Sequence, residues 1–272
     1  MAEFKPVIWH EGTSHYYEVK PALPLQRLID CYWVSLPQMN EIESRIIPDL
    51  CADFIMTFTP EMKLKQLRYS GPNTRYFLSI DQSSEVTLGI RFYLSSLRNW
   101  LPNNLSQTKD QLLVEWDGFA PFSKHLMMAM EMGLTCCQLI SSFNEFFLKE
   151  LSTEQTSSSS LIKNIIKNSL EMVDYREIIC KEVVSERTIQ RIFREETGLS
   201  PYEAYDILRF QKALKSMLIN PARSLSDVAL SHGYCDQAHY NRRFKVISGL
   251  TPSEVRQSCR NYPRHELNDK IN

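Results

Sequence analysis

The stretch "SERTIQRIFREETGLSPYE" (Ser185–Glu203) recurs 51 residues later as "DQAHYNRRFKVISGLTPSE" (Asp236–Glu254). The first residue of each copy is of a type that caps a helix N-terminus by accepting a free backbone N–H. Gly198 and Gly249 stand at matching positions, where a helix can end in a left-handed residue. The repeat therefore predicts the same capped helix, about three turns long, at two places in the chain.

Both predicted helices are amphipathic, with an apolar face opposite a face of polar or small residues. The apolar faces are made by Ile189, Ile192 and Phe193 in the first copy, and by Tyr240, Phe244 and Ile247 in the second. The opposite faces carry Arg187, Gln190, Arg191 and Arg194, and Ala238, Asn241, Arg242 and Lys245. Arg243 lies nearer the rim of the apolar face, so we expect it to touch backbone or solvent rather than bases.

A shorter helix and a tight turn precede each copy. "SLSDVALSHGY" (Ser224–Tyr234) begins at a Ser cap and ends with Gly233 in the turn, which is a helix-turn-helix layout. The segment before the first copy, "DYREIICKEVVSE" (Asp174–Glu186), fits less well because Val183 stands where the turn favours glycine. The stretch "YEAYDILRFQKALKSMLIN" (Tyr202–Asn220) predicts one long helix that holds the two units apart.

The polar faces have a simple alternative explanation, because Arg, Gln or Asn on a single helix is ordinarily only solvated. Here the same kind of face recurs on the second helix of two helix-turn-helix units. Arg can bond guanine O6 and N7, Gln or Asn can bond adenine N6 and N7, and an Ala or Thr methyl suits the thymine methyl. Two such units can enter successive major grooves, about 34 Å apart. The pattern favours double-stranded DNA as the partner.

The charge is distributed unevenly along the chain. Residues 1–160 hold 13 Lys and Arg against 18 Asp and Glu, a net of −5, whereas residues 161–272 hold 18 against 14, a net of +4. A locally basic C-terminal half is consistent with a polyanion partner. The polar stretch "STEQTSSSS" (152–160) falls where the sign changes and is typical of a linker.

The N-terminal part predicts strands followed by helices. Short runs rich in β-branched and aromatic residues, separated by turn residues, extend to about Phe92 and predict a small antiparallel sheet or barrel. Within them, "PLQRLIDCYW" also fits a short helix leading into a strand. From Leu94 onward the spacing is helical, with one or two amphipathic helices between Phe122 and Leu151. Their Met stripe (Met127, Met128, Met130, Met132) predicts core or a subunit interface. The fold class is therefore α+β.

Asp49, Asp53 and Arg91 are polar residues within apolar strands, and either line a pocket or serve in pairing and turns. The seven cysteines form no C-x-x-C pair, which argues against a disulfide framework or a structural zinc site and favours reduced, mostly buried thiols. No apolar run is long enough to span a bilayer and no signal peptide is evident, so we expect a cytoplasmic protein without a membrane partner.

Residues 161–264 resemble the DNA-binding domain of the AraC/XylS family of bacterial transcription regulators. The resemblance is carried by "SERTIQRIFREETGLSP", "LRFQKALKSML", "SLSDVALSHGYCDQAHYNRRFK" and "GLTPSEVR". It implies base contacts at Arg187, Thr188, Gln190 and Arg191, and at Gln237, Ala238, Asn241 and Arg242. The cap Ser185 with Arg194 and Lys245 suits phosphates. The N-terminal part resembles, more weakly, the effector-type domain that precedes such domains, through "LQRLIDCYW", "IIPDLCADFIMTF" and "LGIRFYLSSL".

We therefore expect an effector-sensing or dimerisation domain at 1–151, the linker at 152–160, the DNA-binding domain at 161–264 and a tail at 265–272. The leading hypothesis is a sequence-specific regulator modulated by a small molecule or partner, without a cofactor, metal or enzymatic activity. RNA polymerase is a further partner if the chain is an activator, and the helices within 122–151 leave a homodimer open.

A repair enzyme of the alkyl-transfer type, sharing the same DNA-binding module, is the alternative. It needs a cysteine activated by a nearby base, and the sequence shows no Pro-Cys-His motif. A purely architectural DNA-binding protein is a third possibility, which an N-terminal part of some 150 residues argues against.

Overall fold

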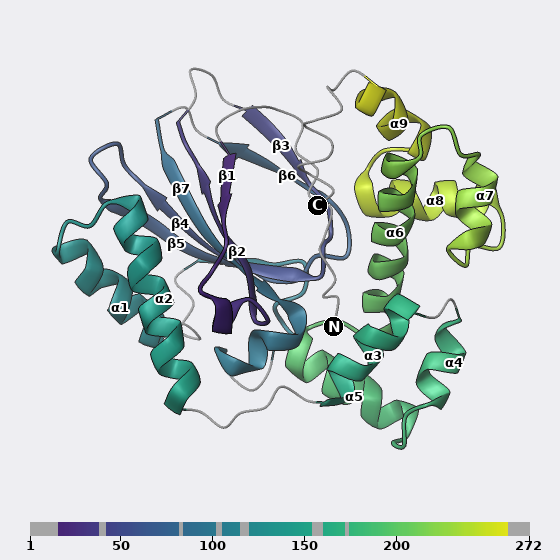
Figure 1. Ribbon diagram of the computed structural model, residues 1–272, viewed down its shortest axis with the longest axis horizontal. Coiled ribbons are helices and arrows are strands. Elements are labelled where there is room, and N and C mark those ends of the chain that lie inside the picture. Colours follow the sequence, from purple (N-terminus) through teal and green to yellow (C-terminus); the bar gives the residue numbers. More distant parts are fainter. Residues whose placement is uncertain are drawn as a thin grey trace.

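The computed structural model describes residues 16–37, 42–81, 84–101, 105–114, 120–153, 160–171 and 174–260. A sheet with two covering helices forms the N-terminal half and a group of helices forms the C-terminal half, so the predicted α+β class is confirmed (Figure 1). The predicted tail and most of the predicted linker lie outside the described residues, although Ser152 and Thr153 still belong to one helix and Ser160 opens the next.

Most strands pair into one antiparallel sheet of six, in the order β1-β2-β7-β4-β5-β8. Two others, β3 and β6, form a separate antiparallel pair. The strands are β1 (Tyr16–Val19), β2 (Ile29–Ser35), β3 (Ile42–Ile46), β4 (Cys51–Phe58), β5 (Leu64–Ser70), β6 (Phe77–Asp81), β7 (Val86–Tyr93) and β8 (Leu112–Val114). The runs quoted above cover β2, β4 and β7, and the short helix before β2 is the 3-10 helix η1 (Leu23–Leu25).

The prediction of helical structure from Leu94 onward is wrong for one segment. A 3-10 helix η2 (Leu94–Asn99) does follow β7, but Leu112–Val114 then returns to the sheet as β8. It pairs with β5, where Tyr69 faces Leu113 in register. A three-residue edge strand has too few residues for a periodic pattern, and its structure comes from pairing with a distant strand.

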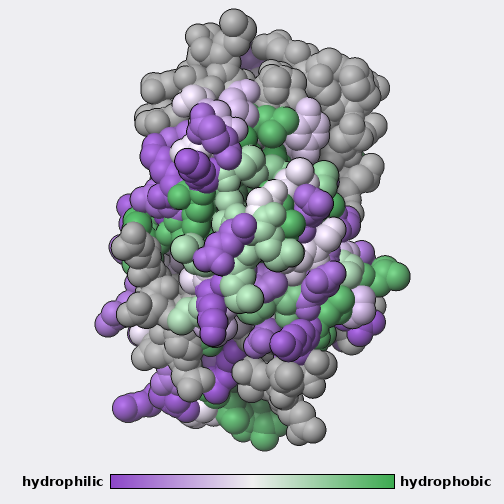
Figure 2. Space-filling model, turned by 90° about the vertical axis from the view of Figure 1, so that its left-hand side faces the viewer, coloured by the Kyte–Doolittle hydropathy of each residue, from purple (hydrophilic) through white to green (hydrophobic). Residues whose placement is uncertain are grey.

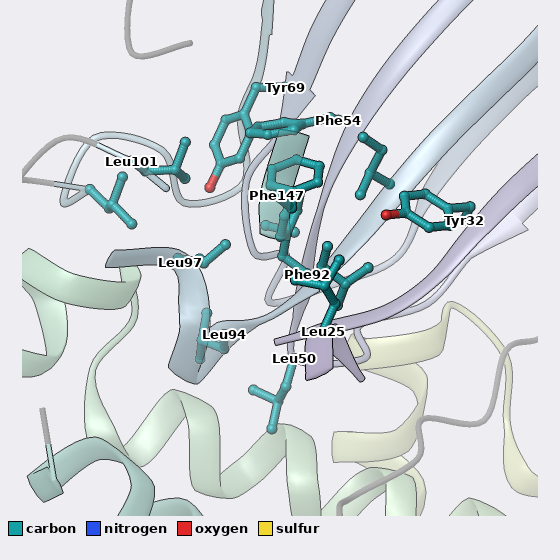
Figure 3. Close-up of a cluster of buried hydrophobic side chains, with 14 of the residues drawn as sticks. Leu25, Tyr32, Leu50, Phe54, Tyr69, Phe92, Leu94, Leu97, Leu101 and Phe147 are labelled. Carbon is teal, nitrogen blue, oxygen red and sulfur yellow. The ribbon is translucent and has the colours of Figure 1, made fainter. Parts of the chain in front are cut away.

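Aromatic residues build the core between the sheet and two helices, α1 (Ala120–Glu131) and α2 (Cys136–Thr153). The ring of Phe54 on β4 lies 4.7 Å from that of Phe92 on β7, and Phe92 lies 5.5 Å from Phe147 on α2. Figure 3 shows these rings converging, with Leu50 and Leu94 at the lower edge of the cluster, nearest the green helices. The same apolar cluster continues into the C-terminal half.

The C-terminal half consists of helices arranged around one long helix, α6. They are α3 (Ser160–Glu171), α4 (Tyr175–Cys180), α5 (Glu186–Thr197), α6 (Pro201–Ile219), α7 (Leu225–Ser231), α8 (Gln237–Ser248) and α9 (Pro252–Arg260). Figure 1 shows α4 and α5 at the lower end of α6, and α7, α8 and α9 at its upper end. We call α4 and α5 the first unit, and α7 and α8 the second unit.

The two units differ in how they join the rest of the molecule. Ile189 and Phe193 of α5 belong to the large cluster that includes the sheet core. The core of the second unit is a separate cluster around Tyr240 and Phe244, to which the described N-terminal residues contribute Ile47 as a buried member. The first unit is thus built into the N-terminal half, whereas the second has a core of its own.

The core interpretation of the Met stripe and the prediction of mostly buried cysteines are wrong. Met127, Met128 and Met132 are exposed, so the core interpretation fails for them. Figure 2 views the side of the molecule on which α1 lies in Figure 1, and it shows moderately apolar groups mixed with hydrophilic ones. The cysteines are not mostly buried. Among the described residues Cys31 and Cys51 are buried, whereas Cys137, Cys180 and Cys235 are exposed. Among the described residues no cluster has the makeup of a metal site, and none of the helices could cross a bilayer.

Candidate nucleic-acid interface

The structure confirms both predicted helices and their capped starts. The Ser185 hydroxyl accepts a hydrogen bond from the backbone N–H of Thr188 at 3.3 Å, and α5 begins one residue after Ser185. The Asp236 carboxylate accepts from the N–H of His239 at 2.6 Å, and α8 begins one residue after Asp236. Both helices end at a left-handed glycine, with φ of 79° at Gly198 and 78° at Gly249.

Matching residues in the last turn, and at the start of the next helix, also make matching bonds. The hydroxyl of Thr197 donates to the carbonyl of Phe193 at 2.6 Å, and that of Ser248 donates to the carbonyl of Phe244 at 2.8 Å. The next helix then starts with a capping pair in both copies. Ser200 N–H donates to Glu203 at 2.7 Å, and Thr251 N–H donates to Glu254 at 2.6 Å. The last-turn hydroxyls and the capping pairs therefore have the same structural role in both copies of the repeat.

The predicted apolar faces are buried and the predicted polar faces reach the surface. Ile189 and Phe193 are buried on α5, and Tyr240, Phe244 and Ile247 on α8. On the other side, exposed residues are Arg187, Arg191 and Arg194 on α5, and Gln237, Ala238, Arg242 and Lys245 on α8; Thr188, Gln190 and Asn241 are half-buried. The structure thus brings the predicted site residues to one edge of each helix.

Several of these side chains already have partners within the protein. Ser185 and Thr188 share a hydrogen bond between their hydroxyls at 3.0 Å, in addition to the cap. Arg191 Nη1 lies 2.7 Å from Glu195 Oε2, one turn further along α5. The Oδ1 atom of Asn241 is buried without a hydrogen-bond partner among the residues that the structure describes, so a bidentate contact to adenine requires this amide to turn.

The turns of the two units differ where the sequence departs from the repeat. In the second unit Gly233 has a φ of 74° and Tyr234 is buried against Tyr240. In the first unit α4 ends at Cys180, and the residue after it, Lys181, has an ordinary right-handed backbone. At the offset of 51 residues Glu182 is the position that matches Gly233, while Val183 matches Tyr234 and is fully exposed. The first turn therefore forms without a left-handed residue and leaves its apolar side chain in solvent.

Sequence reasoning missed how the N-terminal half contacts α5 and α8, the second helix of each unit. The backbone N–H of Leu105 donates to the carbonyl of Glu195 at 2.8 Å, in the last turn of α5. The backbone N–H of Tyr76 donates to the carbonyl of Ile247 at 2.7 Å, in the last turn of α8. Such last-turn carbonyls have no partner within their own helix. No local pattern in the sequence marks Leu105 or Tyr76 for this role.

Arg243 does lie at the rim of the core and keeps 37% of its side chain exposed, but it also has a protein partner that the sequence did not predict. Its guanidinium contacts the buried carboxylate of Asp206 on α6, with the Nε atom 3.1 Å from Oδ2. The position matched with Arg243 in the first unit is Ile192, which packs against the core. This row of the helix therefore lies at the rim of the core in both units.

Asp49, Asp53 and Arg91 are brought together, and they pair with one another. Arg91 Nε lies 3.5 Å from Asp49 Oδ2 and 3.4 Å from Asp53 Oδ1, and Trp33 Nε1 donates to Asp53 at 2.8 Å. Burial raises the pKa of Asp49 to about 7, although the positive charge of Arg91 opposes the shift. The pairing interpretation of these residues is thus the one that the structure supports.

Two family models match the chain. Residues 181–258 match a helix-turn-helix domain and residues 17–114 match a domain of unknown function. The chain thus carries an AraC-type helix-turn-helix domain, the domain through which the sequence resembles the AraC family.

Among similar proteins, the HTH-type transcriptional activator RhaS of Escherichia fergusonii is 32% identical over 87 residues, 32% of this chain and 31% of RhaS. The Msm operon regulatory protein of Streptococcus mutans is 26% identical over 137 residues, 50% of this chain and 49% of that protein. The chain thus matches about a third to a half of the length of these relatives. The crystal structure of ToxT from Vibrio cholerae O395 aligns at 14% identity with a TM-score of 0.42, over 85% of this chain and 99% of ToxT.

Proposed function

We propose that the chain is a transcription regulator that binds double-stranded DNA with α5 and α8 in successive major grooves. The observation that carries the proposal is the structural repeat: two helices with the same caps, anchors and ends, each with a polar edge at the surface. They sit near opposite ends of α6 (Figure 1). The relatives are named as transcription regulators, which supports a regulator over a repair enzyme.

We assign direct base contacts to the exposed edges and phosphate contacts to their margins. Base contacts fall to Arg187, Thr188, Gln190, Arg191, Gln237, Ala238, Asn241 and Arg242, and phosphate contacts to Ser185, Arg194 and Lys245. Because Ala238 offers only a methyl group, where α5 has Arg187, we expect fewer bases to be specified by the second unit.

The test is selection of duplexes from a random DNA pool, followed by affinity measurements at physiological salt. Arg191→Ala and Arg242→Ala should each weaken binding to the selected site by about 1–3 kcal/mol and relax the base preference at one position. Lys124→Ala removes the same charge from an exposed site on α1, far from α8 in Figure 1, and should leave binding unchanged. Failure to select any sequence, or wild-type affinity in both Arg variants, would count against the proposal.

We further propose that the N-terminal half modulates DNA binding through its contacts with the two units. The amides of Leu105 and Tyr76 bond the last turn of α5 and of α8, so movement of either loop reaches one of the two helices. Two ion pairs join the same halves, Arg98 with Glu196 at 3.1 Å and Lys109 with Glu203 at 2.9 Å. A ligand that shifts these loops changes the spacing on which simultaneous binding of two grooves depends.

A thermal-shift screen of metabolites against the full chain tests this part, because a ligand of the native state raises Tm. A ligand found in this way should change DNA affinity, and by linkage DNA should change ligand affinity by the same factor. A ligand that binds without affecting DNA affinity contradicts modulation. Contact with RNA polymerase and homodimerisation through α1 and α2 remain predictions.

A further inference from the structure

One buried carboxylate joins the second unit to the long helix α6. Asp206 is 2% exposed, and each of its oxygens is occupied by a different arginine. Arg209 Nη2, one turn further along α6, lies 2.5 Å from Oδ1. Arg243, on α8, contacts Oδ2 through both Nη2 and Nε. We call Asp206, Arg209 and Arg243 the Asp206 cluster.

Arg209 extends the cluster into the turn of the second unit. Its Nη1 atom donates to the backbone carbonyl of Gly233 at 3.0 Å, and its guanidinium lies 4.3 Å from the ring centre of Tyr234. The cluster therefore connects three parts of the fold, namely α6, the turn between α7 and α8, and α8 itself. A buried carboxylate is costly unless its oxygens are well paired, and here both oxygens are.

The apolar anchors of α8 leave the helix able to rotate about its long axis, and Arg243 restricts that rotation. Tyr240 and Phe244 are four residues apart and lie nearly in line along the helix, so they fix its position better than its rotation about that line. Arg243 lies to one side of the line, and its two contacts with Asp206 resist rolling of the helix. Arg242, the residue before Arg243, is exposed on the opposite side of α8, so the direction of its side chain depends on this rotation.

We propose that Arg243 is a positioning residue that acts with Asp206 to aim Asn241 and Arg242 at the bases, and that it does not itself contact DNA. The proposal rests on the proposed function, since it explains how that edge is oriented. It also assigns a role to the cation of α8 that contacts a buried carboxylate. The guanidinium of Arg243 is committed to Asp206, whereas Lys245 on the same helix is free to reach a phosphate.

Salt dependence and base preference distinguish positioning from a phosphate contact. Arg243→Met should weaken binding about tenfold and relax base preference only in the half-site of α8, with an unchanged slope of log K against log salt. Lys245→Ala, as the contrast, should weaken binding evenly across sequences and reduce the slope by about 1. A slope reduced in Arg243→Met, or a base preference kept intact, overturns the proposal.

Arg243→Lys keeps the charge but loses the two-point contact, and should fold whichever role is correct. If Arg243 positions the helix, this variant should show a weakened base preference in the half-site of α8. If Arg243 contacts a phosphate, the variant should bind DNA like the wild type, and that result would overturn the proposal.

The coupling of Arg243 to Asp206 is also measurable without DNA. Arg243→Met, Asp206→Asn and the double variant are unfolded in urea, and the double variant should lose less stability than the two single losses added together. Additive losses overturn the pairing. A wild-type chain that selects no DNA while the coupling persists refutes the proposed function and leaves the pairing intact, so the two failures are distinguishable.

Discussion

The two units share their local bonds and differ in their surroundings. Their caps, final glycines and last-turn hydroxyl bonds match position for position. The anchors of α5, however, lie in the cluster that includes the sheet, while those of α8 form a separate cluster with Phe210 and Tyr234. The repeat thus specifies two similar helices, and the contacts outside the repeat decide how each is held.

The units also differ in charge. On α5 the three arginines are accompanied by Glu186, Glu195 and Glu196, and Arg191 is paired with Glu195. The segment of α8 contains no acidic residue, and Val246 stands where α5 has Glu195. We therefore expect the second unit to supply more of the salt-dependent DNA affinity. The first unit should supply less, because its arginines are partly neutralised by carboxylates of the same helix.

The largest effect should come from removing the matched aromatic anchors. Phe193→Ala and Phe244→Ala each leave a cavity in a buried cluster, and we expect each to lower the free energy of unfolding by about 3–5 kcal/mol. Because Phe193 packs with the sheet core, its loss should speed amide exchange in the sheet as well as in the first unit.

Loss of Phe244 should speed exchange only within the second unit and its end of α6. The measurement is amide hydrogen exchange in both variants, resolved for individual peptides. The same pattern of exposed peptides in both would show that the two clusters are one cooperative unit.

The next largest effect concerns the two glycines that end α5 and α8. A Cβ at Gly198 would lie 2.9 Å from the backbone oxygen of Leu105, and one at Gly249 would lie 2.5 Å from the ring of Tyr76. Both residues have positive φ, which costs about 1–2 kcal/mol for a residue with a side chain. Gly198→Ala and Gly249→Ala should therefore cost more than that strain alone, since the N-terminal half must also move.

Gly133→Ala is the matched control, because Gly133 has a φ of 65° and an added Cβ would meet no atom within 4 Å. Unfolding in urea measures all three variants. A loss at Gly198 or Gly249 no greater than at Gly133 would show that the contact between the halves yields without cost.

The helices of both units could be predicted because the signals that define them are local. Cap residues, a final glycine and apolar spacing of three and four all lie within about 14 residues of one another, and they placed the starts of α5 and α8 correctly. The same periodicity identified the polar edges. It could not identify β5 and β8, because their pairing joins distant segments and neither segment alternates apolar with polar residues.

Contacts between elements could not be predicted from the sequence for the same reason. Nothing near Arg243 indicates that its partner is Asp206, and nothing near Leu105 indicates that it bonds α5. The Met stripe of α1 illustrates the other limit. Helical spacing shows that residues share a face, but whether another element covers that face depends on the rest of the fold.

A smaller effect should follow from exchanging the charge difference between the units. Val246→Glu places a carboxylate one turn after Arg242, which recreates the pairing seen between Arg191 and Glu195. We expect it to weaken DNA binding by about 1 kcal/mol, through the competing pair and repulsion from phosphates. Glu195→Gln should strengthen binding by a similar factor because it frees Arg191.

Binding of the selected duplex measures both variants. Glu145→Gln, an equal charge change at an exposed position on α2, should have no effect. Opposite signs for Val246→Glu and Glu195→Gln support the charge comparison, and an unchanged affinity in both contradicts it.

The smallest effect distinguishes the units by pH, through a histidine in the turn of the second unit. Burial lowers the pKa of His232, helped by the positive charges of Lys212 and Arg223. The unfolded chain therefore takes up a proton more readily as the pH falls past about 6.5, so the contribution of neutral His232 is present above that pH and lost below it. Acidification should thus destabilise the wild type more than His232→Gln, with a difference in Tm of about 1 °C between pH 7.5 and pH 5. Taking this difference cancels the opposite effect of Asp49, whose raised pKa makes acid stabilising. Equal shifts of Tm in the two proteins would show that His232 is as readily protonated in the folded chain as in the unfolded one.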